Sequence, residues 1–254
     1  MLEFAQETKA QLVRWMIHLR REPFNIAFNL LNPVILLIFM GGAFQGLAQG
    51  SVGGDYRTYL LPGILALTAF GNSMAGGIPL LFDKENGSLL RLMSTPISRA
   101  SILVGRFLAV NINTTLQCVI ILGLGFIFGV HIAAGLGGVL ALLVIGLLLG
   151  FGVTVISLIL AFVLKNHGDF FAIIGISALP ATFLSSAFVP LDFLPLWMRL
   201  IAWVNPMTYM IDAMRSLILS GWDLPLLVRM AIVLLVFDGA MFWLGSKVLR
   251  RHLA

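Results

Sequence analysis

Asp238 is the residue whose type and position most directly suggest chemistry in this sequence. It lies well inside an apolar stretch that runs from residue 225 to 246. Acidic side chains inside membrane helices are rare, and in carriers they often hold the coupled proton or ion. A carboxylate partnered by neighbouring polar groups is the simpler interpretation, and we favour it. Asp238 nevertheless defines an alternative function, that of an ion-coupled secondary carrier.

The other reactive side chains are too scattered to form a catalytic or metal site. The four histidines stand on different segments, without the His-x-x-x-His or Cys-x-x-Cys spacing of a metal site. None of the lysines follows a glycine in the Gly-Lys-[Ser/Thr] order of a nucleotide-binding loop, and no Gly-x-Ser-x-Gly elbow marks a hydrolase. We therefore expect no catalytic residue, metal or cofactor in this chain, and no ATP hydrolysis by the chain alone.

The composition predicts the elements that carry these residues. Of the 254 residues, 59% are hydrophobic and only 11% are charged, whereas soluble domains carry about 25% charged residues. Charge-poor runs long enough to cross a bilayer occur six times, since a spanning helix needs roughly 20 apolar residues. The predicted spans are residues 23–47, 57–82, 101–129, 136–164, 170–189 and 225–246. The predicted fold class is therefore an all-α integral membrane protein.

The distribution of basic residues predicts the orientation of these spans. If both ends lie in the cytoplasm, twelve of the sixteen Lys and Arg residues are on the cytoplasmic side, as the positive-inside rule requires. The net charge of +5 then faces anionic lipid and needs no nucleic-acid partner. The first 22 residues lack a signal-peptide pattern and instead predict an amphipathic helix at the membrane interface. Its predicted apolar face contains Leu12, Met16 and Leu19.

Two connecting segments are too apolar for ordinary solvated loops. In the cytoplasmic segment 83–99, Asn86 or Ser88 would cap a short helix that Pro96 ends, with exposed leucines that suit either a docking knob or a lipid-facing loop. In the external segment, four prolines and many large apolar residues predict two short re-entrant helices at about 195–203 and 206–219. Asp212 and Arg215 would pair on the second of them.

Three features together resemble the membrane subunits of ABC-2 type transporters, and most closely the bacterial drug- and antibiotic-efflux permeases. Residues 82–99 read FDKENGSLLRLMSTPISR and look like the family's segment after its second span. Residues 194–199, LPLWMR, and 205–209, NPMTY, match a second motif of the family. The order of elements also matches from end to end: an interfacial helix, six spans, and short external helices before the last span. Two departures stand in the first motif, where Ser88 replaces a frequent Thr and Leu90 replaces a frequent Glu.

The resemblance implies a permease subunit of a bacterial inner-membrane exporter. Two copies, or one copy and a paralogue, would pair around the pathway, and two separate ATPase subunits would bind ATP and Mg²⁺ and dock underneath. The substrate would be amphipathic, such as a drug, a lipid or a glycolipid, and would move outward. The residues nearest the ATPase would be Glu85, Asn86, Gly87, Leu89, Leu90 and Arg91. The second and fifth spans would line the pathway with Phe70, Asn72, Ser73, Phe183, Ser185 and Ser186.

Two other classes of function remain as alternatives. The ion-coupled carrier would use Asp238 and would transport without ATP. A membrane-embedded scaffold would not transport at all, and it predicts that the loop 83–99 tolerates disruptive substitution.

Overall fold

The computed structural model describes residues 2–21, 23–44, 55–94 and 97–253 of the chain. The described residues fold into helices and connecting turns, which confirms the predicted all-α class. The first half contains α1 (Leu2–Arg21), α2 (Pro23–Ile35), the π-helical turn η1 (Leu36–Met40), α3 (Gly41–Ala43), α5 (Tyr56–Ala75), α6 (Ile78–Glu85), α7 (Ser88–Met93) and α8 (Arg99–Ile127). The second half contains α9 (Gly135–Val163), α10 (His167–Phe183), the 3₁₀ turn η2 (Leu191–Phe193), α11 (Leu196–Val204), α12 (Pro206–Leu219) and α13 (Leu224–Leu253).

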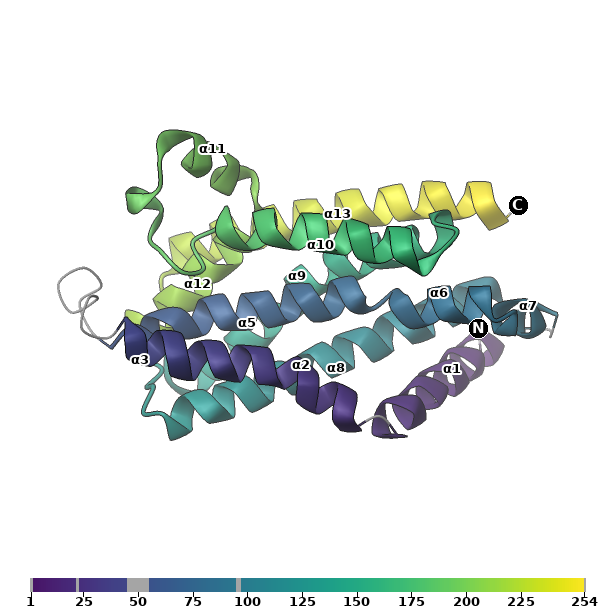
Figure 1. The fold of residues 1–254 in the computed structure, drawn as a ribbon, viewed down its shortest axis with the longest axis horizontal. Helices are drawn as coiled ribbons and strands as arrows, with labels where there is room; N and C mark the ends of the chain where they lie inside the picture. The colour runs from purple at the N-terminus through teal and green to yellow at the C-terminus, as the bar shows by residue number, and fades with distance from the viewer. Residues whose placement is uncertain (1, 22, 45–54, 95–96, 254) are drawn as a thin grey trace.

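Helices occur at each of the six predicted spans and run along the long axis of the molecule (Figure 1). Within the described residues, four stretches are long and apolar enough to cross a membrane: Tyr56–Glu85, Ala100–Ile127, Gly135–Val163 and Leu224–Val248. The other two apolar helices, Asn29–Ala43 and His167–Phe183, are shorter. The end of the first predicted span, residues 45–47, lies outside the described residues. The start of α1, the end of α13, and α6 and α7 lie at one end of the bundle, opposite α3 and α12 (Figure 1).

The second predicted span is broken into α5 and α6 at Gly76 and Gly77. Two consecutive glycines weaken a helix, and Pro79 in the first turn of α6 favours a new helix start. The break is held by Ser157 of α9, whose hydroxyl accepts a hydrogen bond from the Gly77 N–H (2.7 Å) and donates one to the Met74 carbonyl. A Cβ at Gly77 would collide with the Ser157 backbone, so the glycine permits this close approach.

α5 forms the centre of the bundle and is buried along most of its length. α8, α9 and α12 pack around it, and a single apolar cluster extends from Leu60 and Leu65 of α5 to Met210 of α12. This arrangement leaves α2 and α10 on the outside of the bundle, where several of their large apolar side chains are exposed.

α1 packs along α8 with a different face from the predicted apolar one. The buried residues of α1 are Thr8, Gln11 and Trp15, whereas the predicted apolar face, Leu12, Met16 and Leu19, is only partly buried. The reason lies on α8, where Gly105 has no side chain and lets the backbone of α1 approach closely at Thr8 and Gln11. α1 therefore packs on α8 with the face beside Leu12, Met16 and Leu19, and the contact of that apolar face with the membrane interface stays a prediction.

The segment before α13 contains two short helices close to the predicted positions. Asn205 caps α12 through a hydrogen bond from the Met207 N–H (3.0 Å), and Pro206 occupies the first turn. α12 is largely buried against α5, α9 and α13, whereas α11 projects from the bundle (Figure 1). The predicted pair of Asp212 and Arg215 is confirmed, with 3.5 Å between the carboxylate and the guanidinium.

Candidate functional site

The predicted coupling segment forms a hairpin of two short helices, α6 and α7. Asn86 ends α6, and Gly87 follows with a positive φ of +70°, the left-handed conformation in which helices commonly terminate at glycine. The carbonyl of Gly87 then accepts the Arg91 N–H (3.2 Å), so α7 begins at once. The Asn-Gly sequence thus ends one helix and starts the next within two residues. Pro96, which we expected to end this helix, lies outside the described residues.

The expectation that the leucines of α7 are exposed is wrong for Leu89. Only 7% of Leu89 is exposed, and it packs in a cluster formed by Leu80, Leu81, Ile102, Leu103, Leu158, Ala161 and Phe170. Leu92 is partly buried against the same cluster, and the side chain of Leu90 lies outside the described residues. The described exposed side chains of the hairpin are those of Phe82, Glu85, Asn86 and Arg91, with Ser94 beyond it. Leu89 therefore anchors α7 to the bundle, and the polar residues form its outer surface.

Three consecutive residues at the end of α6 each bind a different helix. Asp83 pairs with Arg14 of α1 (2.9 Å). Lys84 donates from Nζ to the carbonyls of Phe162 and Leu164 at the end of α9, both at 2.8 Å. Glu85 accepts the backbone N–H of His167, the first residue of α10, at 2.8 Å, and its carboxylate lies 3.0 Å from His167 Nδ1. We call Asp83, Lys84 and Glu85 the clamp.

The charges of the clamp match the helix ends that they bind. The last carbonyls of a helix lack intrahelical partners and carry partial negative charge, which the ammonium of Lys84 satisfies at the end of α9. The first N–H groups of α10 carry partial positive charge, which the carboxylate of Glu85 satisfies. Because Phe170 is the only residue of α10 that is fully buried, this cap is a principal attachment of α10 to the hairpin.

A further contact ties α1 to the start of α8. The carboxylate of Glu7 accepts the backbone N–H of Ser98 (3.0 Å), and this hydrogen bond lowers the pKa of Glu7. Ser98 in turn caps α8 by accepting the Ser101 N–H (3.2 Å). α1 is thus joined to both sides of the segment that contains the hairpin.

Three of the six predicted pathway residues line a common groove between α2, α5, α8 and α10. Phe70, Asn72 and Phe183 contribute to a cavity of about 430 Å³. The wall also contains aliphatic side chains and further polar ones, those of Thr68, Gln117, Asn29, Asn32 and Thr182. The groove therefore offers both apolar and hydrogen-bonding surface, although its use as a pathway stays a prediction.

The other three predicted pathway residues do not line this groove. Ser73 is fully buried and faces α9 near Gly150. Ser185 donates to the Thr182 carbonyl (2.6 Å), and Ser186 donates to Asp212 (2.7 Å). These serines therefore belong to helix packing and to the turn after α10.

An interhelical amide pair beside the groove was missed in the sequence. Asn72 of α5 donates to Gln117 of α8 (2.6 Å), and Asn113 lies one turn before Gln117. The available signal was the set of amide residues within otherwise apolar spans, because buried amides in a membrane helix must find a partner. Sequence spacing of 45 residues gave no indication of which amides meet.

Asp238 lies apart from both the hairpin and the groove. It is buried on α13 against Gly152 of α9, where a Cβ would collide with its carboxylate. Its Oδ1 has no hydrogen-bond partner among the described residues. Within the same part of the chain, no cluster of three or more metal-binding side chains occurs. Asp238 does not line the groove between α2, α5, α8 and α10.

Comparison with known proteins finds sequence similarity to a protein family and to several permeases. A family model described as "ABC-2 type transporter" matches residues 6–219. The "Putative transport permease ycf38" of Cyanophora paradoxa is 32% identical over 262 residues, which cover 97% of this chain and 90% of that protein. The "Probable doxorubicin resistance ABC transporter permease protein DrrC" of Mycobacterium tuberculosis (strain ATCC 25618 / H37Rv) is 27% identical, covering 86% of this chain and 79% of that protein. The "Probable multidrug ABC transporter permease YbhR" of Escherichia coli (strain K12) is 26% identical, covering 67% and 46%.

Proposed function

This chain belongs to the ABC-2 type transporter family and is a membrane subunit of an ABC transporter. We propose that it exports an amphipathic compound. A separate ATPase subunit, which binds ATP and Mg²⁺, supplies the energy by docking under α6 and α7. The proposed direction is outward across a plasma membrane in which both termini are cytoplasmic. Two ATPase copies and two permease copies, or a permease and a paralogue, complete the transporter.

The observation that carries this proposal is the clamp. The described exposed side chains of the hairpin are polar except for Phe82, and this surface is available to a partner. The clamp connects the same hairpin to α10, whose other end contributes Phe183 to the groove. A push on the hairpin is therefore transmitted to a wall of the groove through charge-assisted hydrogen bonds between rigid helices.

The nature of the groove supports an amphipathic substrate. Aromatic and aliphatic side chains would hold the apolar part of the substrate, while Thr68, Asn72 and Gln117 offer hydrogen bonds to its polar part. The names of two relatives, which refer to multidrug transport and doxorubicin resistance, are consistent with this class. A second permease copy would cover exposed apolar residues beside the groove, such as Leu31 and Phe39 of the first span and Ile176 and Leu179 of α10.

Arg91→Glu tests the docking of the ATPase. Arg91 is exposed on α7, so reversing its charge is expected to weaken co-purification of the ATPase subunit at least about tenfold while the permease still inserts. Leu89 is unsuitable for this test, because its burial means that a polar substitution would disturb the fold. The control is Lys247→Glu, an exposed cation near the end of α13. Undiminished association of the Arg91→Glu variant would contradict docking at α7.

Asp238→Asn separates the exporter from the ion-coupled carrier. The substitution keeps the shape of the side chain and removes its ability to carry a proton, so we expect ATP-driven export to stay within about twofold of wild type. The measurement is uptake into inverted vesicles with ATP, and with a proton gradient alone. Export that is lost in a well-folded variant, together with gradient-driven transport by wild type, would favour the carrier.

A further inference from the structure

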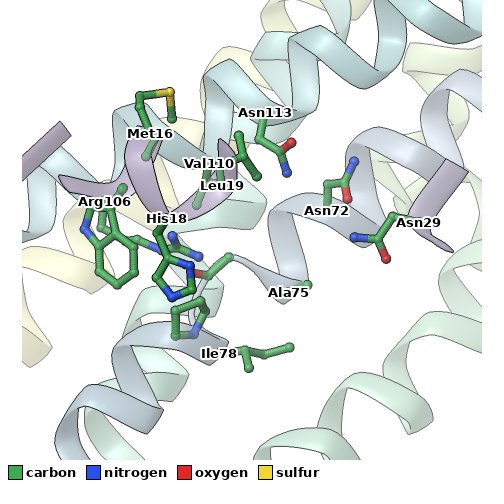
Figure 2. A pocket seen from close by; sticks show the side chains of 14 residues that line it. Met16, His18, Leu19, Asn29, Asn72, Ala75, Ile78, Arg106, Val110 and Asn113 are labelled. Atoms are coloured by element: carbon green, nitrogen blue, oxygen red, sulfur yellow. The ribbon is translucent and has the colours of Figure 1, made fainter. Parts of the chain in front are cut away.

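A second cavity lies between α1 and the break that separates α5 from α6. It has a volume of about 240 Å³, and its wall includes Trp15 and His18 of α1, Asn29 of α2, Asn72 of α5, and Arg106 and Asn113 of α8. Figure 2 shows Arg106 and His18 on one side of this cavity and Asn29 and Asn72 on the other. We call it the arginine pocket.

Arg106 is held in place but keeps hydrogen-bonding capacity for a ligand. Its Nε donates to the Gly76 carbonyl (2.7 Å), and its guanidinium lies 4.3 Å from the centroid of the Trp15 ring. In the described part of the chain, its two terminal nitrogens donate to no partner. The nearby carboxylate of Asp83 is already paired with Arg14. A positioned, incompletely satisfied guanidinium inside a cavity is suited to an anion.

The arginine pocket is the middle one of three adjoining cavities. His18 is shared with a more open cavity of about 620 Å³ on α1, whose wall also contains Arg14 and Arg21. Asn29, Asn72 and Ala75 are shared with the groove between α2, α5, α8 and α10. The lining therefore changes from basic on α1, through Arg106, to neutral amides and aromatic groups deeper in the bundle.

The charge along this series selects one sign of ligand. Among the described residues that line the three cavities, none is Asp or Glu. A cationic head group would therefore meet three arginines in the cavity walls, of which, within the described chain, Arg14 alone is paired with a carboxylate, that of Asp83, whereas an anionic one gains attraction from Arg21 and Arg106. Amides further along can donate hydrogen bonds to the same anion without binding it too tightly to leave.

We propose that the arginine pocket binds the anionic head group, a phosphate or a carboxylate, of an amphiphile on its way to the groove. This inference rests on the proposed export function and names the charge of its substrate. Arg14, His18 and Arg21 attract the head group, Arg106 binds it, and Asn72 and Gln117 receive it in the groove. The apolar tail follows along the aromatic and aliphatic wall that contains Phe70 and Phe183.

The test is photoaffinity labelling of the full-length chain in nanodiscs of zwitterionic phosphatidylcholine. The probe is dodecyl phosphate with a diazirine in its chain, and the competitors are dodecyl phosphate, dodecyltrimethylammonium and inorganic phosphate. We expect dodecyl phosphate to compete at least about tenfold better than the cation, which matches it in chain length. This comparison uses the wild-type protein only and needs no nucleotide, so it gives an answer even where ATPase docking fails.

Variants then locate the site. Arg106→Gln is expected to raise the half-saturating probe concentration at least about tenfold, and Arg106→Lys, which keeps the charge, by less. The control is Arg20→Gln, which removes one exposed charge from α1 outside the three cavities. Wild-type labelling of the Arg106→Gln variant, or equal competition by the cation, would overturn the proposal. Equal competition by inorganic phosphate would overturn the amphiphile and make a soluble anion the ligand.

Discussion

Replacing Glu85 with alanine is expected to leave the ATPase subunit bound and hydrolysing ATP while export falls at least about tenfold. Asn86 and Arg91 of the exposed hairpin surface stay intact in this variant, but the cap that joins α6 to the first turn of α10 is lost. Coupling free energies of about 1–3 kcal/mol correspond to roughly 5- to 150-fold effects, and a charge-assisted cap is of this size. Export and ATP hydrolysis are measured together on the reconstituted complex.

Two further variants make this result specific to the cap. His167→Ala removes the ring nitrogen but keeps the backbone N–H that donates to Glu85, so it should lose less export than Glu85→Ala. Asp169→Ala removes another carboxylate from the first turn of α10, one that is exposed, and should leave coupling unchanged. Full export by the Glu85→Ala variant would show that the hairpin moves the groove by another route.

Replacing Arg215 with methionine is expected to cause the largest loss of stability. The guanidinium of Arg215 donates to the Ser186 carbonyl (2.7 Å), lies 3.9 Å from the centroid of the Tyr59 ring and pairs with Asp212. Its removal breaks the contacts that join α12 to α5 and to the turn after α10. It also leaves the Asp212 carboxylate without the cation that pairs with it. Breaking a buried pair costs about 3–5 kcal/mol; because Asp212 and Arg215 are only partly buried, we expect the lower end of this range, which lowers Tm by roughly 10 °C in a chain of this size.

A double substitution tests this explanation. Asp212→Asn combined with Arg215→Met removes the uncompensated charge and should recover about half of the lost Tm. Arg229→Met is the comparison variant: Arg229 is exposed on α13, lies 5.4 Å from the centroid of the Tyr209 ring and attracts Asp212 without a direct ion pair, so its loss should lower Tm by less. Thermal unfolding in detergent is the measurement. An Arg215→Met variant as stable as wild type would mean that packing alone holds this cap.

The two ends of the helix bundle have different proposed roles. The Asp212–Arg215 network stabilises the end near α12, and the clamp makes the opposite end responsive to a partner. α10 connects them, since its start is capped by Glu85 and the turn after its end contains Ser186, which bonds to Asp212. A helix attached firmly at its ends and weakly along its side is able to shift as a unit.

The positions of the helices follow from the sequence alone. Charge-free runs in an apolar solvent must satisfy their own backbone hydrogen bonds, which requires helices, and local signals such as Asn205-Pro206 and Gly87 set where several of them begin and end. The absence of a nucleotide-binding loop and the family motifs then predict a permease. These properties depend on neighbouring residues, so the sequence displays them directly.

Only the tertiary structure determined which face of each helix is buried and which face lines the groove. A uniformly apolar helix has almost no periodic contrast, so Ser73 and Phe70 of α5 look equally suited to a pathway although only Phe70 lines the groove. Leu89 is buried because helices distant in sequence form a pocket around it. Likewise, the clamp joins residues 69 to 82 positions apart, and the rotation and approach of whole helices determine such contacts.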